Sequence, residues 1–353
     1  MRLLILTQKV DINDDILGFF HRWIEEFAKR CEKVIVICLQ EGRHDLPSNV
    51  KVLSLGEEEK FLKIKRFFRL QSLLLKHIGE VDGVFCHMCP IYAIAAFPLA
   101  KMFRKKLILW YVHKSVNPIL KISEKLVDKI LTASQESCRL KSRKIKIVGH
   151  GIDTDVFKPK LNANLKPENE KFKILFVGRI SPIKDLETLI RAIDVLVNQM
   201  KIKDIQLNVV GDPRLASDQD YLNQIKNLIQ EKKLENFISF FGKVPHTKII
   251  KFYQNTDIFV NLCPTGGMDK VVLEAMACGD PVLICNRTFG RDFGKYAEKL
   301  IFREKNAQDL TQKIHSLENL KDRVEIRSFL RKQVVQKHNL DNLIGKIISE
   351  FKK

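Results

Sequence analysis

The chain has 353 residues and an apolar share of 45%, and its length exceeds the size at which one hydrophobic core usually stops growing. Two globular domains are therefore expected, and the longest apolar run, about ten residues ending at Ala100, is too short to span a bilayer. The formal net charge is +19, and residues 1–150 hold 27 basic against 16 acidic residues. Nucleic acid, anionic lipid headgroups and phosphorylated molecules would all suit this excess.

Targeting and cysteine patterns point to a reducing compartment. Met1 leads straight into an apolar run with no secretory leader pattern. The eight cysteines mostly lie in apolar stretches, and the C-x-x-C pair at 86–89 has no second pair with which to form a zinc site. We expect a cytoplasmic protein, with peripheral attachment to the inner face of the plasma membrane as the alternative.

Short apolar runs alternate with helical patterns in the first half of the chain. Strands are expected at 2–7, 33–38, 50–55, 81–87, 106–112, 129–134 and 145–151, and helices at 17–30, 60–79, from about 91 and before 129. This alternation predicts a parallel sheet with helices on both faces. A polar stretch with two prolines, 151–172, predicts a linker.

A second series of the same kind follows the linker. Strands are expected at 173–179, 205–212, 237–242, 257–262 and 281–285, with helices at 185–199, 218–232, 248–254 and 271–278, and only helical patterns after 306. We therefore expect an α/β chain with two Rossmann-like doubly wound domains, 1–165 and 166–330, facing a cleft. A C-terminal helix is expected over 331–353, and packing of this helix on the first domain is one arrangement that we consider. Ligands in such folds bind at the carboxyl ends of the strands.

One carboxylate interrupts an otherwise apolar helical segment. Seven of the eight residues from Val271 to Cys278 are apolar, the exception being Glu274, and Gly279 suits the position just past the helix end. A carboxylate in a buried helix needs a partner. The two hydroxyls of a ribose would provide one, and Lys270, one turn earlier, is the alternative.

The segment 173–190 predicts an anion site. A strand ends at Gly178, a loop carries Arg179 and Lys184, and a helix follows. The free N–H groups of such a loop and the helix dipole favour anions, and two cations there would clamp a diphosphate. Two solvated surface cations are the alternative, and the absence of a G-x-G-x-x-G pattern weakens a dinucleotide interpretation.

Several ordered motifs resemble a known family. The stretches "VGRISPIKDLETLIRAI", "GHGIDTDVFKP", "NVVGDP", "ISFFGKVPH" and "DIFVNLCPTGGMDKVVLEAMACGDPV" look like the successive motifs of family 4 glycosyltransferases with the GT-B fold, strongly over 145–285 and more weakly before. The resemblance implies a retaining, metal-independent enzyme that takes a sugar from a nucleotide-sugar donor and needs no cofactor. It also implies donor contacts from Gly178, Arg179, Lys184, Gly242, Lys243, Val244, Gly266, Gly267, Met268, Asp269, Lys270 and Glu274.

In this resemblance Arg179 and Lys184 stabilise the departing diphosphate, Glu274 binds the ribose, and the residues 242–244 lie near the base. The chain departs from the family at one position. The first glutamate of the family's Glu-x7-Glu motif would fall at Gly266, so either loop N–H groups and Asp269 replace it or the donor sugar differs.

The first half supplies weaker candidates. By resemblance, Gly18 opens a helix near the donor phosphate, and His113, expected to end the strand 106–113, lies by the reacting sugar, with a hydrogen-bonded histidine at a strand end as the alternative. Asp14, Asp15 and His87 are candidates for binding the acceptor, although for His87 the structural alternative is favoured. The "DTD" at 153–155 lies at the linker entrance, far in sequence from the phosphate loop, and is not expected to bind a metal.

The segment 60–79 has a pattern typical of a helix at an anionic membrane interface. One face collects Phe61, Ile64, Phe67, Phe68, Leu74, Leu75 and Ile78, and the other collects Lys65, Arg66, Arg69 and Lys76. An ordinary helix packed on the sheet is the alternative. With the positive charge of the first half, the pattern favours a lipid-linked or saccharide acceptor in envelope or polysaccharide synthesis.

Three other functions stay open at this point. A nucleotide-sugar epimerase of the same fold would need no acceptor. A nucleic-acid-binding protein would use the charge, although nucleic acid is not expected as a partner because the sequence shows no recognised module for it. A non-catalytic homologue would bind the nucleotide without turnover.

Overall fold

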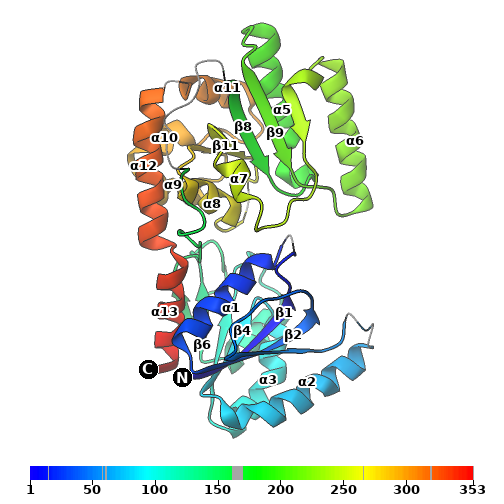
Figure 1. The fold of residues 1–353 in the computed structure, drawn as a ribbon, viewed down its shortest axis with the longest axis vertical. Coiled ribbons are helices and arrows are strands. Elements are labelled where there is room, and N and C mark those ends of the chain that lie inside the picture. The colour runs from blue at the N-terminus through cyan, green and yellow to red at the C-terminus, as the bar shows by residue number, and fades with distance from the viewer. Residues whose placement is uncertain are drawn as a thin grey trace. The chain divides into compact units, whose positions relative to one another are not determined.

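The computed structural model describes residues 1–14, 16–57, 59, 62–160, 170–264, 266–318 and 320–352, with backbone only for 320–322. Contacts divide this part of the chain into two compact units (Figure 1). Unit 1 comprises Met1–Asp153, Pro245–Thr247 and His338–Lys353, and unit 2 comprises Thr154–Val244 and Lys248–Lys337. The chain therefore passes from unit 1 to unit 2 after Asp153, and the expected boundary at 165 lies outside the described residues.

Unit 1 is built on a seven-stranded parallel sheet in the order β3-β2-β1-β4-β5-β6-β7. Its strands are β1 (Arg2–Val10), β2 (Lys33–Glu41), β3 (Val50–Ser54), β4 (Gly83–His87), β5 (Lys106–Trp110), β6 (Lys129–Thr132) and β7 (Ile145–Ile147). The central strand β1 is buried on both faces, because Leu3 and Ile5 belong to one core and Leu4 and Leu6 to the other. The near-continuous apolar runs predicted this arrangement.

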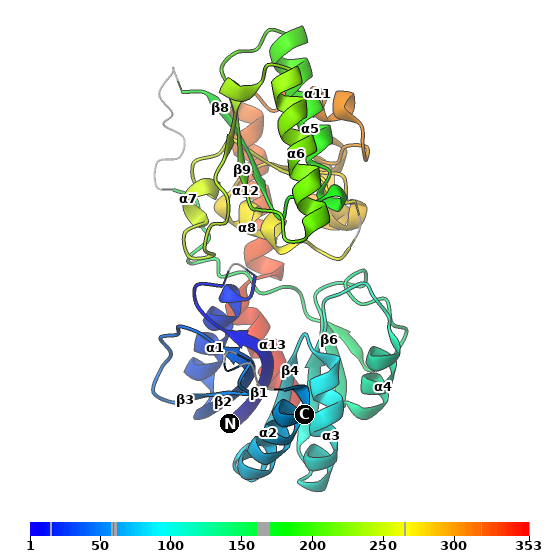
Figure 2. The same ribbon diagram turned by 90° about the vertical axis from the view of Figure 1, so that its right-hand side faces the viewer.

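Helices cover both faces of this sheet (Figure 2). One core packs α1 (Gly18–Arg30) and α13 (Leu340–Lys352) against the sheet through residues such as Trp23 and Ile344. The other core packs α2 (Lys63–His77), α3 (Pro90–Met102) and α4 (Pro118–Leu126) through residues such as Leu74, Ala96 and Leu120.

The C-terminal helix α13 belongs to unit 1. The backbone N–H of Ile152 donates to the carbonyl of His338 at 2.8 Å, and the N–H of Leu340 donates to the carbonyl of Ile152 at 2.9 Å. Lys346 Nζ also donates to the carbonyl of Val148 at 3.0 Å. These bonds tie α13 and the residues just before it to the end of the first segment of unit 1, Met1–Asp153.

Unit 2 is built on a five-stranded parallel sheet in the order β10-β9-β8-β11-β12. Its strands are β8 (Phe172–Val177), β9 (Ile205–Val210), β10 (Ile238–Phe240), β11 (Ile258–Asn261) and β12 (Val282–Ile284). Chain order runs outward in both directions from β8. The boundary between β8 and β11 is therefore a topological switch point, where doubly wound sheets bind ligands beside the carboxyl ends of the strands.

The helices of unit 2 also form two layers (Figure 2). One layer holds α5 (Leu186–Asp194), α6 (Ala216–Glu231) and α11 (Ala307–Ser316), and the other holds α7 (Ile250–Tyr253), α8 (Lys270–Cys278) and α12 (Leu320–Lys337), with the short helices α9 (Gly290–Phe293) and α10 (Ala297–Leu300) following β12. The expected helix 185–199 ends at Asp194 and continues as one wider turn, Val195–Gln199.

Helix α8 is buried nearly all round, as its composition predicted. Every residue from Val272 to Cys278 is buried, and Gly279 ends the helix at φ +82°, a conformation that suits glycine. Two arginines of α12 satisfy carbonyls at this end: Arg327 Nε donates to Gly279 at 2.8 Å, and Arg331 Nη1 donates to Ala277. Cations at a helix C-terminus also complement its dipole.

Within the described residues, no helix combines the length and apolarity that crossing a bilayer requires. All eight cysteines have free thiols, and seven of them are buried.

Candidate functional site

Three glycines follow the three strands at one edge of the unit 2 sheet. Gly178 comes after β8, Gly211 after β9 and Gly242 two residues after β10. The N–H of Gly178 donates to the carbonyl of Val210 at 3.0 Å, and the N–H of Gly211 donates to the carbonyl of Gly242 at 2.8 Å. A Cβ on Gly211 would lie 2.0 Å from the carbonyl oxygen of Gly178, so only glycine permits this approach. The loops therefore form one continuous rim.

Asp212 fixes the loop that holds the predicted base contacts Gly242, Lys243 and Val244. Its Oδ2 accepts the backbone N–H of Lys243 at 3.1 Å, and its carbonyl accepts the N–H of Ile180 at 3.3 Å. Gly242 has φ +63°, which favours glycine. Asp212 was not among the predicted site residues, although it lies in the motif "NVVGDP".

Arg179 is held in place by two side chains that the sequence did not indicate. Its Nε donates to Ser181 Oγ at 3.3 Å and lies 3.8 Å from Oδ2 of Asp218. Asp218 is buried in the first turn of α6, where it also accepts the backbone N–H groups of Arg214 and Leu215 at 3.2 Å. The Arg179 side chain is still 39% exposed, so its guanidinium faces solvent at the strand edge.

Lys184 reaches across the switch point to the start of α8. Its Nζ donates to Asp269 Oδ2 at 2.9 Å, and the same oxygen accepts Asn261 Nδ2 at 3.1 Å. Burial opposes the charge of Lys184, but the Asp269 carboxylate and Cys263 together outweigh burial and raise the pKa of Lys184. The lysine is therefore a fixed cation that joins the loop after β8 to the helix after β11.

The loop before α8 explains the departure at Gly266. This residue has φ +130°, where side chains rarely fit, although among the described residues no atom beyond its chain neighbours lies within 4 Å of where its Cβ would be. A glutamate there would strain this backbone rather than clash with neighbours. Beside it, Met268 is buried, and the carbonyl of Gly267 accepts Asn286 Nδ2 at 3.4 Å.

Glu274 is 2% exposed and has protein partners of its own. Lys270 Nζ lies 3.3 Å from its Oε1, which is the alternative pair that the sequence indicated. Tyr253 Oη donates to its Oε2 at 3.2 Å from α7, a contact that the sequence did not predict. Burial, together with the Glu274 charge, raises the pKa of Tyr253 well above its usual value, so the phenol keeps the proton that it donates. Binding of a ribose by Glu274 stays a proposal.

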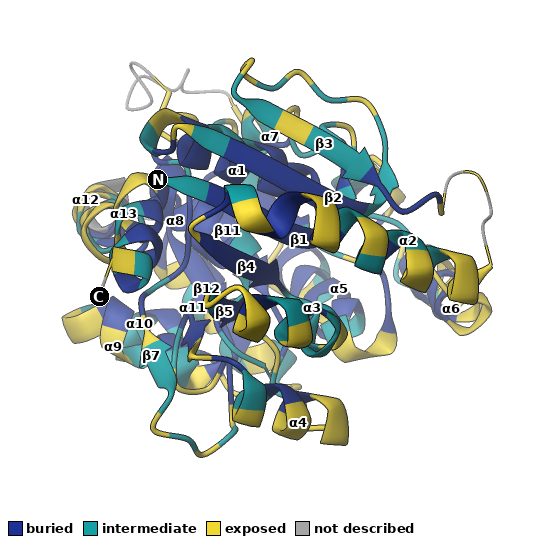
Figure 3. Cartoon of the chain, turned by 90° about the horizontal axis from the view of Figure 1, so that it is seen from below, coloured by how far each residue is buried: buried dark blue, intermediate teal, exposed yellow. Residues whose placement is uncertain are grey.

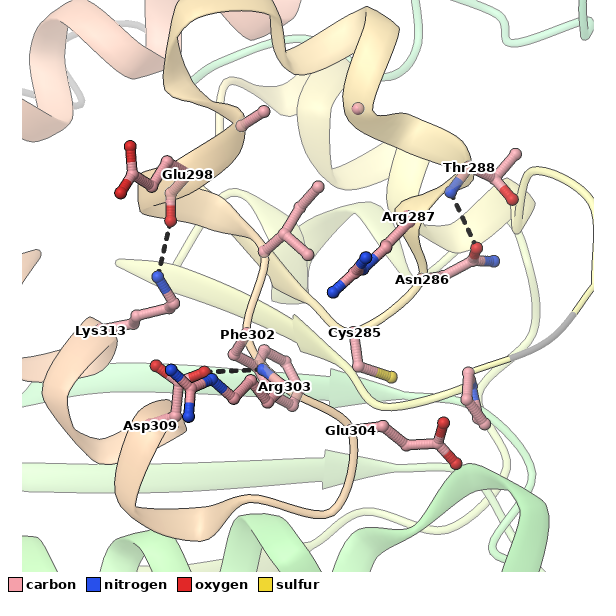
Figure 4. Close-up of a pocket in the computed structure, with 14 residues that line it drawn as sticks. Cys285, Asn286, Arg287, Thr288, Glu298, Phe302, Arg303, Glu304, Asp309 and Lys313 are labelled. Atoms are coloured by element: carbon pink, nitrogen blue, oxygen red, sulfur yellow. Dashed lines mark hydrogen bonds between the residues drawn. The ribbon is translucent and has the colours of Figure 1, made fainter.

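A cavity of about 1040 Å³ lies beside the ends of β11 and β12 (Figure 4). Pro264 and the segment 285–288 line one side, and residues of α10, α11 and the loop before α11 line the other. Lys313 Nζ donates to the carbonyl of Glu298 at 2.6 Å, and the N–H of Arg303 donates to Asp309 Oδ2 at 2.7 Å. Arg287 and Glu304 bring both signs of charge into this cavity.

The candidates in unit 1 around α1 have structural partners. Gly18 is buried and opens α1, as expected. Asp14 organises the preceding turn: its Oδ1 accepts the N–H groups of Ile16 at 2.9 Å and Leu17 at 2.7 Å, and its Oδ2 pairs with Lys9 at 2.8 Å. Burial opposes the charge, but these donors together lower the pKa of Asp14. Asp15 lies outside the described residues.

The two histidines of unit 1 differ in their surroundings. His87 ends β4 at 1% exposure, accepts or donates a bond to Thr7 Oγ1 at 3.1 Å and stacks on Phe20 with ring centroids 3.7 Å apart, so packing accounts for it. His113 does not end a strand as expected, because β5 stops at Trp110. It lies exposed in the next loop, where its Nδ1 accepts the N–H of Ser115 at 3.1 Å.

The "DTD" segment has a structural role at its first aspartate, which pairs with Arg22 of α1. Within the described part of the chain, no group of three or more His, Cys, Asp or Glu side chains is arranged to hold a metal ion.

Comparison with known families identifies the family of this chain. The family described as "Glycosyl transferases group 1" matches residues 157–333, half of the chain. The chain belongs to the group 1 glycosyltransferases. The match contains the whole rim of unit 2, from Gly178 to Glu274.

Curated relatives resemble part of this glycosyltransferase. A D-inositol 3-phosphate glycosyltransferase from Arthrobacter sp. (strain FB24) is 28% identical over 143 residues, 39% of this chain and 33% of the relative. A mannosylfructose-phosphate synthase from Agrobacterium fabrum is 26% identical over 42% of this chain and 34% of the relative. The chain thus matches about a third of the length of these relatives.

Solved structures share the fold over the whole chain. HepE from Anabaena, in complex with UDP, has a TM-score of 0.77 at 16% identity and covers 100% of both chains. Sucrose-phosphate synthase from Thermosynechococcus elongatus has a TM-score of 0.76 at 16% identity and covers 100% of this chain and 98% of that one. The fold of this glycosyltransferase is therefore GT-B, with two Rossmann-like α/β domains.

Proposed function

We propose that this chain transfers a sugar from a nucleotide-sugar donor whose diphosphate binds at the strand-end rim of unit 2. The observation that carries the proposal is the bond from Lys184 to Asp269, because it places a fixed cation at the switch point between β8 and β11. Arg179 adds a second cation at the end of the same strand, and the N-terminus of α8 adds its dipole. On binding, the diphosphate would replace Asp269 as the partner of Lys184.

The proposed reaction retains the configuration of the sugar. The bond between the anomeric carbon and the diphosphate oxygen breaks, the acceptor hydroxyl forms the new glycosidic bond on the same face, and the leaving phosphate takes the hydroxyl proton. Arg179 and Lys184 stabilise the charge that develops on the leaving group, which is the work that a divalent cation does in other transferases. We therefore propose that turnover needs no metal. Glu274 would bind the ribose hydroxyls after giving up its contact with Lys270.

The proposed acceptor carries a phosphate. Two of the relatives described above are named for D-inositol 3-phosphate and for mannosylfructose-phosphate, and both of these compounds carry a phosphate group. The first 150 residues of this chain carry 27 basic and 16 acidic residues, which suits such an acceptor. A lipid-linked saccharide of envelope or polysaccharide synthesis shares this chemistry, as does a small sugar phosphate.

The test is release of nucleoside diphosphate from a panel of UDP-, GDP- and ADP-sugars, with sugar phosphates and with lipid extract as acceptors. We expect one donor to turn over in the wild type, with a large loss in Glu274→Ala. UDP-sugars are the first to try, because the similar structure of HepE from Anabaena holds UDP. Turnover of no donor, together with no nucleotide binding in calorimetry, would overturn the proposal.

Two further measurements test the finer claims. Proton NMR of the first product formed should show the anomeric configuration of the donor, and the opposite configuration would rule out retention. Turnover should persist in excess EDTA, whereas a loss that Mg²⁺ or Mn²⁺ restores would show that a metal is required.

A further inference from the structure

Helix α2 of unit 1 has exposed residues along much of its length (Figure 3). Several of the exposed side chains on α2 and at the end of α3 are large and apolar. On α2, the side chains of Ile64, Phe67, Phe68 and Leu75 are 49–64% exposed, and Met102 and Phe103 at the end of α3 are exposed as well. We call these six residues the apolar face. Clustered apolar side chains on a surface mark an interaction site more often than scattered ones do.

The core does not need this face. Helix α2 packs on the sheet through Leu70 and Leu74, and Ile78 follows them into the same core. Because a helix repeats every 3.6 residues, Ile64, Phe68 and Leu75 fall on a separate stripe from Leu70 and Leu74. The single apolar face expected from the sequence is therefore two faces, one inward and one outward, while Phe61 lies outside the described residues.

The surroundings of the apolar face are positively charged. Residues 57–106 hold ten Lys or Arg side chains and five acidic ones, and neither α2 nor α3 contains an acidic residue. Glu57 pairs with Arg66 of α2 at 2.9 Å, and Glu80 pairs with Lys33 at 2.5 Å. Lys63 and Lys76 are exposed on α2 itself. The charge therefore selects an anionic partner.

A small cationic cavity lies at the end of α3, next in sequence to Met102 and Phe103. Its volume is about 370 Å³, and Lys101, Arg104, Lys105 and Lys106 line it. Asp128 also lines it, with its Oδ2 committed to the backbone N–H of Leu107 at 2.7 Å. Such a cavity has the size and charge to take a phosphate group beside an apolar surface.

We propose that the apolar face docks on a bilayer surface that contains anionic lipids. Phe67, Phe68 and Leu75 enter the boundary between headgroups and acyl chains, while lysines beside them and the cavity after α3 contact lipid phosphates. A protein partner fits less well, because lysine is depleted in protein interfaces and is typical of the polar side of interfacial helices. This docking goes beyond the proposed transfer and does not depend on donor turnover.

The test is co-sedimentation of the full chain with vesicles of phosphatidylcholine alone and of phosphatidylcholine and phosphatidylglycerol in equal parts. We expect binding only to the anionic vesicles, decreasing as salt rises. Leu75→Ser should weaken it several-fold, whereas Leu215→Ser, a matched leucine that is 60% exposed in unit 2 against 58% for Leu75, should not change it. Lys63→Glu with Lys76→Glu should weaken it roughly tenfold or more, and Lys226→Glu on α6 much less.

Each variant is first checked for an unchanged melting temperature, and nucleotide binding is measured separately without vesicles. The docking is supported if the wild type sediments with the anionic vesicles and the Leu75 and Lys63/Lys76 variants do not, even if no donor turns over. Failure of the folded wild type to bind anionic vesicles would overturn the docking, even if the transferase assay succeeds. Binding that these variants retain in full would also overturn it.

Discussion

Lys184 Nζ lies 2.9 Å from Asp269 Oδ2, which joins the loop after β8 to the start of α8. Asn261, at the end of β11, donates to the same oxygen at 3.1 Å. The cation that would bind a donor diphosphate is thus held in position by a carboxylate that a diphosphate would have to displace. Asp269 consequently both orients Lys184 and competes for it.

Neutralising Asp269 should make nucleoside diphosphate binding tighter. In Asp269→Asn the amide oxygen still accepts a bond from Lys184, but it competes weakly with phosphate for the charge. We expect Kd to fall by up to roughly tenfold, since tenfold corresponds to about 1.4 kcal/mol. Calorimetry with the nucleotide checks this, with Asp220→Asn on the exposed surface of α6 as the control. Weaker nucleotide binding in Asp269→Asn would show that Asp269 helps to bind the nucleotide instead of competing with it for Lys184.

Removing the hydroxyl of Tyr253 should destabilise unit 2. Tyr253→Phe leaves the buried Glu274 with one hydrogen bond fewer, and losing a bond to a buried charged group costs roughly 1.5–3 kcal/mol. Urea unfolding measures the change. Tyr296→Phe is the matched control, because Tyr296 Oη donates to Glu325 in an exposed pair at 3.3 Å. Equal stability of the two variants would mean that the Tyr253 contact contributes nothing.

The arginines of α12 should stabilise the end of α8. Arg331 Nη1 donates to the carbonyls of Ala277 and Phe157, the latter at 3.1 Å, and its Nη2 donates to the carbonyl of Thr154 at 3.4 Å, so Arg331→Ala leaves three carbonyls without this donor. We expect a loss of about 2 kcal/mol in the free energy of unfolding. Lys332→Ala, one residue along and exposed, should cost little. Because alanine is the better helix former, neither substitution loses stability through helix propensity, and an equal loss in both variants would show that the bonds of Arg331 contribute nothing specific.

Asp280 should make stability depend on pH. It is fully buried, and within the described residues no hydrogen-bond donor reaches either carboxyl oxygen. Burial raises the pKa of Asp280 well above its usual value, with Asp257 adding to the effect and Arg327 opposing it. Above about pH 4 the unfolded chain loses this proton while the folded chain keeps it, so stability should fall as pH rises, by up to about 1.4 kcal/mol per pH unit.

The variant Asp280→Asn should lack this contribution. The free energy of unfolding of the variant minus that of the wild type, measured in urea from pH 4 to pH 8, should therefore increase as pH rises. If the two curves stay parallel across this range, Asp280 titrates normally and the pKa shift does not exist.

The sequence was sufficient where one local rule decides the structure. The apolar run 271–278 with Gly279 after it predicted a buried helix and its left-handed end, and both are present. The strands around Gly178 and the sheet class followed from the same alternation of apolar runs and helical patterns. Glu274 was a candidate site residue because a charged side chain interrupts a pattern that is otherwise apolar.

Contacts between distant elements could not be predicted in this way. Tyr253 and Glu274 meet across 21 residues, and Lys184 and Asp269 across 85, so their pairing depends on the sheet order, which no local pattern encodes. Helix α2 shows the limit of periodicity. Its pattern placed Leu74 and Leu75 on one face, whereas the core takes Leu74 and leaves Leu75 exposed.

We propose that the loop after β8 binds the diphosphate of the donor through Lys184. The most direct measurement is calorimetric titration of nucleoside diphosphates into the wild type, Lys184→Ala and Lys226→Ala. A bond between a cation and phosphate contributes roughly 1.5–3 kcal/mol, so we predict that Lys184→Ala raises Kd by about tenfold to a hundredfold and that Lys226→Ala leaves it unchanged. A Kd that is the same in all three proteins would contradict the account.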